Sequence, residues 1–195
     1  MDRKEPILDQ EFYHVYNRGN RRQRVFRNDD DYMFFCRRLK EYSHRCRVLI
    51  HAWCLMPNHY HLILSQKVGG SIPAFMATLA TSVTKRSNLK YRQVGHLFQG
   101  AYKYKRITSD EYLVHLSRYI HLNPVFAGLV TEPEDWLYSN YRQFSASLSL
   151  YDDHEIGVLE PILRLFENYH GYVEFVDQYK KMRLEEIQSG ISGDS

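Results

Sequence analysis

The chain of 195 residues carries 26 Lys and Arg against 23 Asp and Glu, and 44% of its residues are hydrophobic. This length predicts one domain, or one domain with an appendage, and the composition excludes disordered, collagen-like and low-complexity proteins. No apolar run approaches the roughly 20 residues of a membrane helix. The charged N-terminus is unlike a signal peptide, and three irregularly spaced cysteines predict neither a disulfide scaffold nor a cysteine-based zinc module. We therefore expect a cytoplasmic protein that makes no membrane contact.

Positive charge is concentrated in the first two thirds of the chain. Residues 1–130 carry 21 Lys and Arg against 10 Asp and Glu, whereas residues 131–195 carry 5 against 13. Clustered Lys and Arg gain affinity for a polyanion because binding releases its counterions. The clusters are Arg18, Arg21, Arg22, Arg24 and Arg27 in one stretch and Lys103, Lys105 and Arg106 in another. We therefore expect nucleic acid as the partner of the basic part, with the acidic remainder facing away from it.

Hydrophobic periodicity and turn residues predict the order β-α-β-β-α-β, followed by a helix. The expected elements, in chain order, are a strand at 12–17, a helix at 29–43, a hairpin of strands at 47–56 and 59–65, a helix at 72–89, a strand at 102–107 and a helix at 110–122. Three aspartates at 29–31 are expected to cap and begin the first helix, Ser71 and Ser109 to cap the next two, and Asn123-Pro124 to end the last. This is the order of an α+β, ferredoxin-like split β-α-β fold, with an antiparallel sheet and helices on one or both faces.

The acidic remainder predicts a helical appendage. Helices are expected at 139–145, 157–166 and 172–187. The chain is therefore expected to divide into a domain at 1–145 and a C-terminal extension at 146–195.

His59 and His61 flank Tyr60 at the start of a predicted strand. Strand side chains alternate between faces, so both imidazoles project to one side and can share a metal ion. Two imidazoles leave coordination positions open for a third ligand and a substrate oxygen. Taken alone, such a pair is more often two hydrogen-bonded histidines on a half-buried strand, so the metal site needs support from its context.

The helix expected from residue 110 carries His115, Tyr119 and Asn123 at successive i+4 steps, hence on one face. If this face lies opposite the histidine strand, a phenol and a metal ion come within reach of one phosphate. Such a site supports phosphodiester chemistry, with tyrosinate attacking in line while the metal neutralises developing charge. Sixteen tyrosines are present, so most must be structural, and Asn123 alone is explained equally well as the end of a helix.

Several motifs, in the expected order, resemble those of the REP-associated tyrosine transposases, a branch of the single-tyrosine HUH transposases related to small insertion-sequence transposases. The matching segments are YHVYNRGNRR (13–22), MPNHYHLIL (56–64), HLFQGAYKYKRI (96–107), RYIHLNPVFAGLV (118–130) and WLYSNY (136–141). The resemblance covers residues 11–144. Tyr60 is aromatic where smaller aliphatic residues are common in the family, but it stays within the bulky apolar class.

The resemblance implies a metal-dependent transposase or nickase that acts on single-stranded, hairpin-forming repeat DNA. Tyr119 is then the nucleophile, His59 and His61 are metal ligands, Asn123 is the third ligand, and His115 is a polar neighbour. The implied reaction forms a 5′-phosphotyrosine and a free 3′-OH that later rejoins DNA. No ATP is needed, in agreement with the lack of a P-loop motif. Mg²⁺ or Mn²⁺ is the expected ion, imidazoles suit Mn²⁺ somewhat better, and zinc stays open from the residues alone.

The expected partner is single-stranded or hairpin DNA, at the nucleoid, and a homodimer is compatible with the sequence. Phosphate contacts are expected from Arg18, Arg21, Arg22, Arg24, Lys103, Lys105 and Arg106, with Lys85, Arg86, Lys90 and Arg92 extending the basic track. One alternative is a non-catalytic, regulatory protein that binds hairpin DNA. Another is a zinc-dependent hydrolase that activates water, although no acidic base stands out for it. The joint presence of two histidines, a tyrosine and an asparagine favours the transposase.

Overall fold

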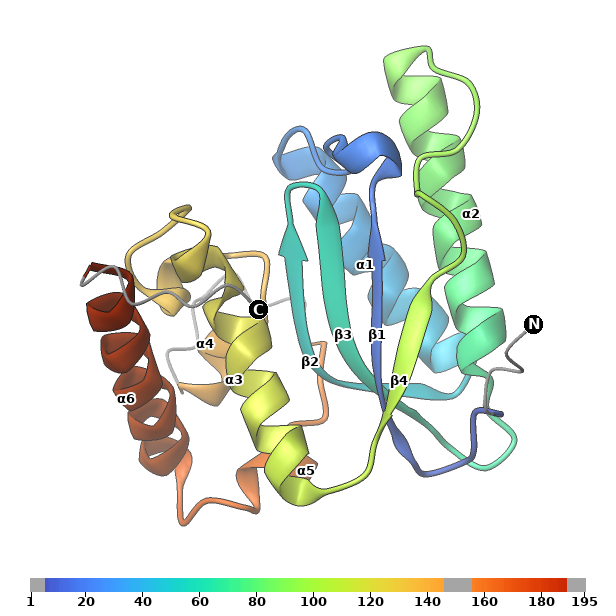
Figure 1. The fold of residues 1–195 in the computed structure, drawn as a ribbon. Coiled ribbons are helices and arrows are strands. Elements are labelled where there is room, and N and C mark those ends of the chain that lie inside the picture. The colour runs from blue at the N-terminus through green and yellow to red at the C-terminus, as the bar shows by residue number, and fades with distance from the viewer. Residues whose placement is uncertain (1–5, 146–155, 189–195) are drawn as a thin grey trace.

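One antiparallel sheet forms the centre of the protein, in a computed structural model that describes residues 6–145 and 156–188 (Figure 1). The strands lie in the order β2-β3-β1-β4. Their bounds are Phe12–Arg18 for β1, Val48–Met56 for β2, His59–Gln66 for β3 and Lys103–Ile107 for β4. With helices between β1 and β2 and between β3 and β4, this topology confirms the expected α+β, ferredoxin-like split β-α-β fold.

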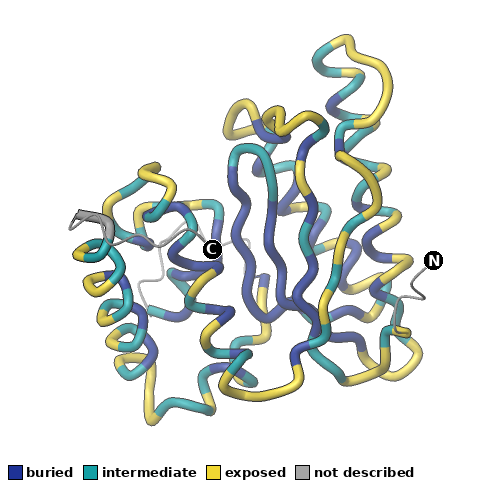
Figure 2. The backbone as a smooth tube through the Cα atoms, in the orientation of Figure 1, coloured by how far each residue is buried: buried dark blue, intermediate teal, exposed yellow. Residues whose placement is uncertain are grey.

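Helices cover both faces of the sheet. On one face, α1 (Asp29–Arg45) and α2 (Ile72–Tyr91) pack on alternate strand residues such as Val15, Tyr60 and Leu62. The other face packs against α3 (Asp110–Phe126) through residues centred on β2. Figure 2 shows that β2 and β3 are buried along most of their length, whereas the segment after β1 and the far end of α2 are exposed. Because α3 lies beside β2, it leaves part of this second face uncovered over β1 and β4.

The helix caps agree with the sequence except at α1. Asn28 is the N-cap of α1, and its side chain accepts a hydrogen bond from the backbone of Asp31, so the three aspartates occupy the first turn instead of the cap. Ser71 caps α2 and Ser109 caps α3, as predicted. Carboxylates in the first turn stabilise α1, because they interact favourably with the positive end of the helix dipole.

The sequence prediction was wrong about the end of α3, which continues through Pro124 to Phe126. Proline lacks the N–H that would bond to the carbonyl of Ile120, four residues earlier. The side-chain nitrogen of Asn123 donates instead, at 2.9 Å to the carbonyl of Tyr119 and at 3.5 Å to that of Ile120. The carbonyl of Ile120 thus has a weak side-chain partner in place of a backbone N–H.

The C-terminal part packs against α3. Its elements are η2 (Pro133–Asp135), α4 (Tyr141–Phe144), α5 (Glu160–Leu163) and α6 (Tyr169–Gln188). A second 3-10 helix, η1 (Asn20–Arg22), lies near the N-terminal end, directly after β1. Tyr172 and Val176 of α6 are buried in the same cluster as the inner side of α3. The expected domain boundary after residue 145 lies at a segment, 146–155, outside the described residues. Within the described ranges, no helix is both long and apolar enough to cross a membrane.

A buried polar network joins α3, β2 and α6 at His121, which is fully buried. The side-chain oxygen of Asn140 accepts from the backbone N–H of Trp53, while its nitrogen donates to the carbonyl of His51, so its orientation is fixed. His121 Nε2 therefore donates to that same oxygen over 3.0 Å, and its Nδ1 lies 2.7 Å from the hydroxyl of Tyr172, which also donates to Oγ of Ser117. Burial lowers the pKa of His121 to about 4.

This network predicts that the protein loses stability in mild acid. Between pH 6.5 and about 4 the unfolded chain binds a proton at His121 that the folded chain excludes. The contribution is therefore complete above pH 6.5 and is lost as the pH falls, by up to about 3 kcal/mol near pH 4. Denaturant unfolding in EDTA from pH 7 to 4.5 measures the slope. His121→Gln should reduce this slope by its own share, because His14, His51, His59 and His61 supply the rest, whereas His170→Gln, at an exposed position of α6, should not reduce it. Equal slopes in all three proteins would contradict this account.

Candidate active site

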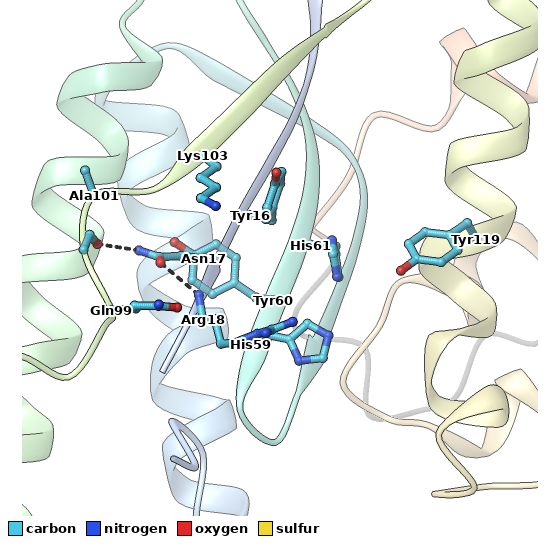
Figure 3. A pocket seen from close by; sticks show the side chains of 11 residues that line it. Tyr16, Asn17, Arg18, His59, Tyr60, His61, Gln99, Ala101, Lys103 and Tyr119 are labelled. Atoms are coloured by element: carbon cyan, nitrogen blue, oxygen red, sulfur yellow. Dashed lines mark hydrogen bonds between the residues drawn. The ribbon is translucent and has the colours of Figure 1, made fainter. Parts of the chain in front are cut away.

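His59 and His61 meet Tyr119 of the same chain across an open part of the sheet. The two histidines project from one face of β3, as the alternation predicts, and their ring centroids are 5.1 Å apart. The ring of Tyr119, on α3, lies 5.8 Å from that of His61 and edge-on to it. Figure 3 shows the phenol oxygen directed toward the histidine pair. Tyr119 is 45% exposed, so a substrate can reach it from solvent.

A cavity of about 390 Å³ surrounds this group. Strands β1 and β3 form its floor, Tyr119 forms one wall, and the segment Gln99–Gly100–Ala101 before β4 forms the other (Figure 3). The side chain of Asn17 donates to the carbonyl of Gly100, which holds that segment against β1. Arg18 and Lys103 also line the cavity, so an anion that enters it meets two cations.

Hydrogen bonds orient both imidazoles for a ligand. His59 Nδ1 donates to the side-chain oxygen of Asn58 over 2.6 Å. His61 Nδ1 lies 2.9 Å from Nε2 of a third histidine, His14, on β1. Each of the two histidines thus makes its hydrogen bond through Nδ1, which leaves its Nε2 as the nitrogen that can face a ligand. A metal-binding histidine uses one nitrogen for the metal and bonds through the other, so this arrangement fits a divalent ion.

The surroundings keep all three histidines neutral. Burial lowers the pKa of His59 to about 4, with the nearby cation Arg18 adding to the effect. Burial also lowers the pKa of His61 to about 3, with contributions from His14, His59 and Arg18. The pKa of His14 falls to about 4, through burial and the charge of Lys105. Neutral imidazole is the form that binds metal ions, so no proton has to be displaced at neutral pH.

The structure does not bring the other two helix residues into this cavity. Asn123 lies one turn beyond Tyr119, but its side-chain nitrogen bonds to the backbone of α3, and the residue is not among those that line the cavity. His115 lies against Phe175 of α6, and its Nδ1 accepts from the guanidinium of Arg118. Within the described part of the chain, no three His, Cys, Asp or Glu side chains gather into a metal-binding group.

The basic residues predicted to contact DNA fall into two sets. Arg18 and Lys103 line the cavity, and Lys105 follows on the same face of β4, with its ammonium 5.0 Å from the ring of Tyr112. Arg106 points to the opposite face and pairs with Glu11. Arg21, Arg22 and Arg24 are exposed in the segment that follows β1. The cavity is therefore continuous with a basic face and, at its outer edge, with a basic loop.

Two of the four further basic residues predicted to extend this track are already paired with aspartates. Arg86 and Lys90 of α2 bind Asp30 at 2.6 and 2.8 Å, and Lys90 also binds Asp31. These contacts brace the end of α2 against the start of α1. They leave Lys85 and Arg92, both exposed, as the residues of this group that fit a phosphate contact.

Sequence reasoning missed His14 and Tyr16 and left the role of Gln99 open. All three lie beside or in the cavity: Tyr16 and Gln99 line it, and His14 bonds to His61. The alternation of β1 indicated that His14 and Tyr16 share a face, but only the pairing of Tyr16 with His61 shows that this is the face of the histidine pair.

In this fold, two histidines on the sheet face a tyrosine on a helix. The family profile described as "Transposase IS200 like" matches residues 9–123. This match spans more than half of the chain, and the chain belongs to the IS200-like transposase family, a family of enzymes.

Several solved structures, including the following two, are similar to the chain, and no curated protein matches it. A REP-associated tyrosine transposase bound to a REP hairpin has 17% sequence identity and a TM-score of 0.65, covering 82% of this chain and 93% of that one. A protein from Deinococcus radiodurans assigned as a transposase has 19% identity and a TM-score of 0.44, covering 62% and 95%. The first likeness supports the fold.

Proposed function

We propose that this transposase cuts and rejoins single-stranded DNA through a covalent bond between Tyr119 and a 5′-phosphate. The observation that carries the proposal is the position of the Tyr119 phenol opposite His59 and His61 in one cavity (Figure 3). An enzyme that cuts a DNA strand and rejoins it without ATP must conserve the energy of the phosphodiester between the two steps. A phosphotyrosine bond does so without ATP.

In the proposed first step, Tyr119 Oη attacks the phosphorus of the scissile phosphate in line with the departing 3′-oxygen. The bond from phosphorus to Oη forms as the bond from phosphorus to O3′ breaks. The phenol proton is lost to water and the departing oxygen takes up a proton, leaving a 5′-phosphotyrosine and a free 3′-OH. Attack by a 3′-OH reverses these changes and restores the phosphodiester.

His59 and His61 would hold the divalent ion, with Mg²⁺ or Mn²⁺ as the proposed cofactor. When bound, such an ion neutralises charge that develops on the phosphate oxygens. Its remaining positions suit oxygen atoms of water, of the phosphate or of Asn123, since hard divalent ions accept oxygen ligands. Arg18 and Lys103 would hold the flanking phosphates, so that the scissile phosphate stays in line with Tyr119.

We further propose that the DNA carries a hairpin next to the cut strand. The similar solved structure is of a transposase bound to a REP hairpin, and here the exposed Arg21, Arg22 and Arg24 lie at the outer edge of the cavity. A duplex stem against this basic loop would deliver its single-stranded flank to Tyr119. Such DNA would place the protein at the nucleoid.

The test uses hairpin oligonucleotides from the repeats that flank the gene, with single-stranded extensions, in Mn²⁺. Each DNA is labelled at its 5′ end or its 3′ end in turn. We expect an SDS-resistant adduct that retains the 3′ label, because the protein stays on the 5′-phosphate. An adduct that retains only the 5′ label would contradict the polarity. Tight hairpin binding with no adduct, in any divalent ion, would favour a regulatory DNA-binding protein.

Removing one cavity cation should weaken DNA binding in a way that salt reveals. Lys103→Ala is expected to lower the affinity for single-stranded DNA and to reduce the slope of log K against log salt by about 0.7, the value for one lost phosphate contact. Arg106→Ala is the matched change elsewhere on β4, at a cation that points to the other face and pairs with Glu11. Equal salt slopes for Lys103→Ala and the wild-type protein would contradict a phosphate contact.

A further inference from the structure

A third histidine supports the histidine pair from the neighbouring strand. His14 lies in the middle of β1 and is 9% exposed. Its Nε2 is 2.9 Å from Nδ1 of His61. The ring centroids are 5.1 Å apart and the ring planes are inclined by 22°. A contact this short between nitrogens with the centroids this far apart means that the rings lie end to end and nearly in one plane, in a direct hydrogen bond.

This bond has two possible proton arrangements, and only one of them leaves His61 able to bind a cation. If His61 Nδ1 carries the proton, it donates to His14 Nε2, and the lone pair of His61 Nε2 is free on the cavity side. If His14 Nε2 carries the proton, it donates to His61 Nδ1. A neutral His61 is then protonated at Nε2, which blocks the ligand position.

We propose that His14 is a positioning residue, whose Nε2 accepts the Nδ1 proton of His61 and so presents the His61 Nε2 lone pair to a divalent ion. The inference rests on the proposed function, because it assumes an ion at the histidine pair. His59 has a corresponding partner in Asn58, which accepts from its Nδ1. Each histidine of the pair is thus held by an acceptor of its own.

The charges around His14 favour a neutral acceptor at this place. A carboxylate is a common partner of metal-binding histidines, but here it would stand beside a cavity meant for a phosphate. Lys105 pairs with His14 across β1 and β4, and Arg18 acts on His61, so the surrounding charges are positive. A neutral imidazole orients His61 and leaves these cations free to attract the DNA.

The first test measures Mn²⁺ affinity without DNA, by electron paramagnetic resonance of free Mn²⁺. His14→Leu is expected to weaken binding by about 10- to 100-fold, the usual cost of losing such a partner. His14→Gln can place its amide oxygen near the position of Nε2, so it should restore affinity to within a few-fold of wild type. His51→Leu removes another buried, hydrogen-bonded histidine, which bonds to Ser65 instead of the pair, and should leave Mn²⁺ affinity unchanged.

The second test reads the proton directly. ¹⁵N NMR of the metal-free protein should show His61 protonated at Nδ1 and bare at Nε2, and this preference should be lost in His14→Leu. Wild-type affinity for Mn²⁺ in His14→Leu, or a His61 protonated at Nε2 in the wild-type protein, would overturn the inference. If the wild-type protein binds no divalent ion, the metal in the proposed function fails, while the NMR result still decides the hydrogen bond.

Discussion

Tyr119→Phe is expected to abolish strand cleavage, by a factor of at least about 10³, while DNA affinity stays within about twofold of wild type. The substitution removes one oxygen, which is the nucleophile, and keeps the ring that forms a wall of the cavity. Tyr119 is nearly half exposed, and its ring contacts His61 edge-on, so phenylalanine can take the same place without leaving a void in the protein interior. Loss of chemistry without loss of binding distinguishes a nucleophile from a side chain that only stacks on DNA.

Single-turnover cleavage of labelled hairpin DNA and binding in EDTA measure the two quantities separately. Tyr169→Phe is the matched control, because Tyr169 is 48% exposed, close to the exposure of Tyr119, and lies on α6 away from the cavity. It should cleave at the wild-type rate. Cleavage by Tyr119→Phe at an undiminished rate would show that water or another residue attacks the phosphate, as in the hydrolase alternative.

The parts of this site that sequence predicts are those set by local periodicity. Alternation along a strand places His59 and His61 on one face, and the Ser109 cap fixes where α3 begins, so Tyr119 follows at a known turn. These features depend on neighbours within a few residues. The same holds for the β-α-β-β-α-β order, which alone suggests the sheet that the structure contains.

The parts that sequence does not predict depend on contacts between distant segments. The role of His14 needs the register of β1 against β3, which no local pattern encodes. His115 and Tyr119 share a helical face by spacing, yet the packing of α6 draws His115 toward Phe175. Asn123 before a proline is typical of a helix end, but the helix continues to Phe126, and the side chain of Asn123 bonds to the backbone of the preceding turn.

The C-terminal extension also has a position that its acidic composition does not reveal. The guanidinium of Arg118, next to the proposed nucleophile, lies 4.1 Å from the ring centroid of Phe175 and 3.9 Å from that of Tyr179, both on α6. Tyr172 bonds to His121 on the buried side of α3. The helix that carries Tyr119 is thus held between α6 and the sheet, so the extension determines where the nucleophile stands.

His61→Ala is expected to abolish metal-dependent cleavage as fully as Tyr119→Phe does, because it removes one of two imidazoles from the site. Added Mn²⁺ at high concentration should restore part of the rate for His61→Ala but none for Tyr119→Phe, since only the first variant has a weakened metal site. Melting temperatures of both variants would show whether each is folded, a necessary control because His61 is buried.

A mixture of these two inactive variants then shows whether one chain supplies the whole site. Only residues 108 and 109 separate β4 from α3, and the three steps from Ile107 to Asp110 span at most about 11 Å. Because α6 also packs on α3, an exchange of α3 between subunits would require α3 to leave both the sheet and α6 of its own chain. We therefore expect the mixture to stay inactive even if the protein dimerises. Recovery of cleavage on mixing would mean that Tyr119 of one chain works with the histidines of another, and that α3 exchanges between subunits.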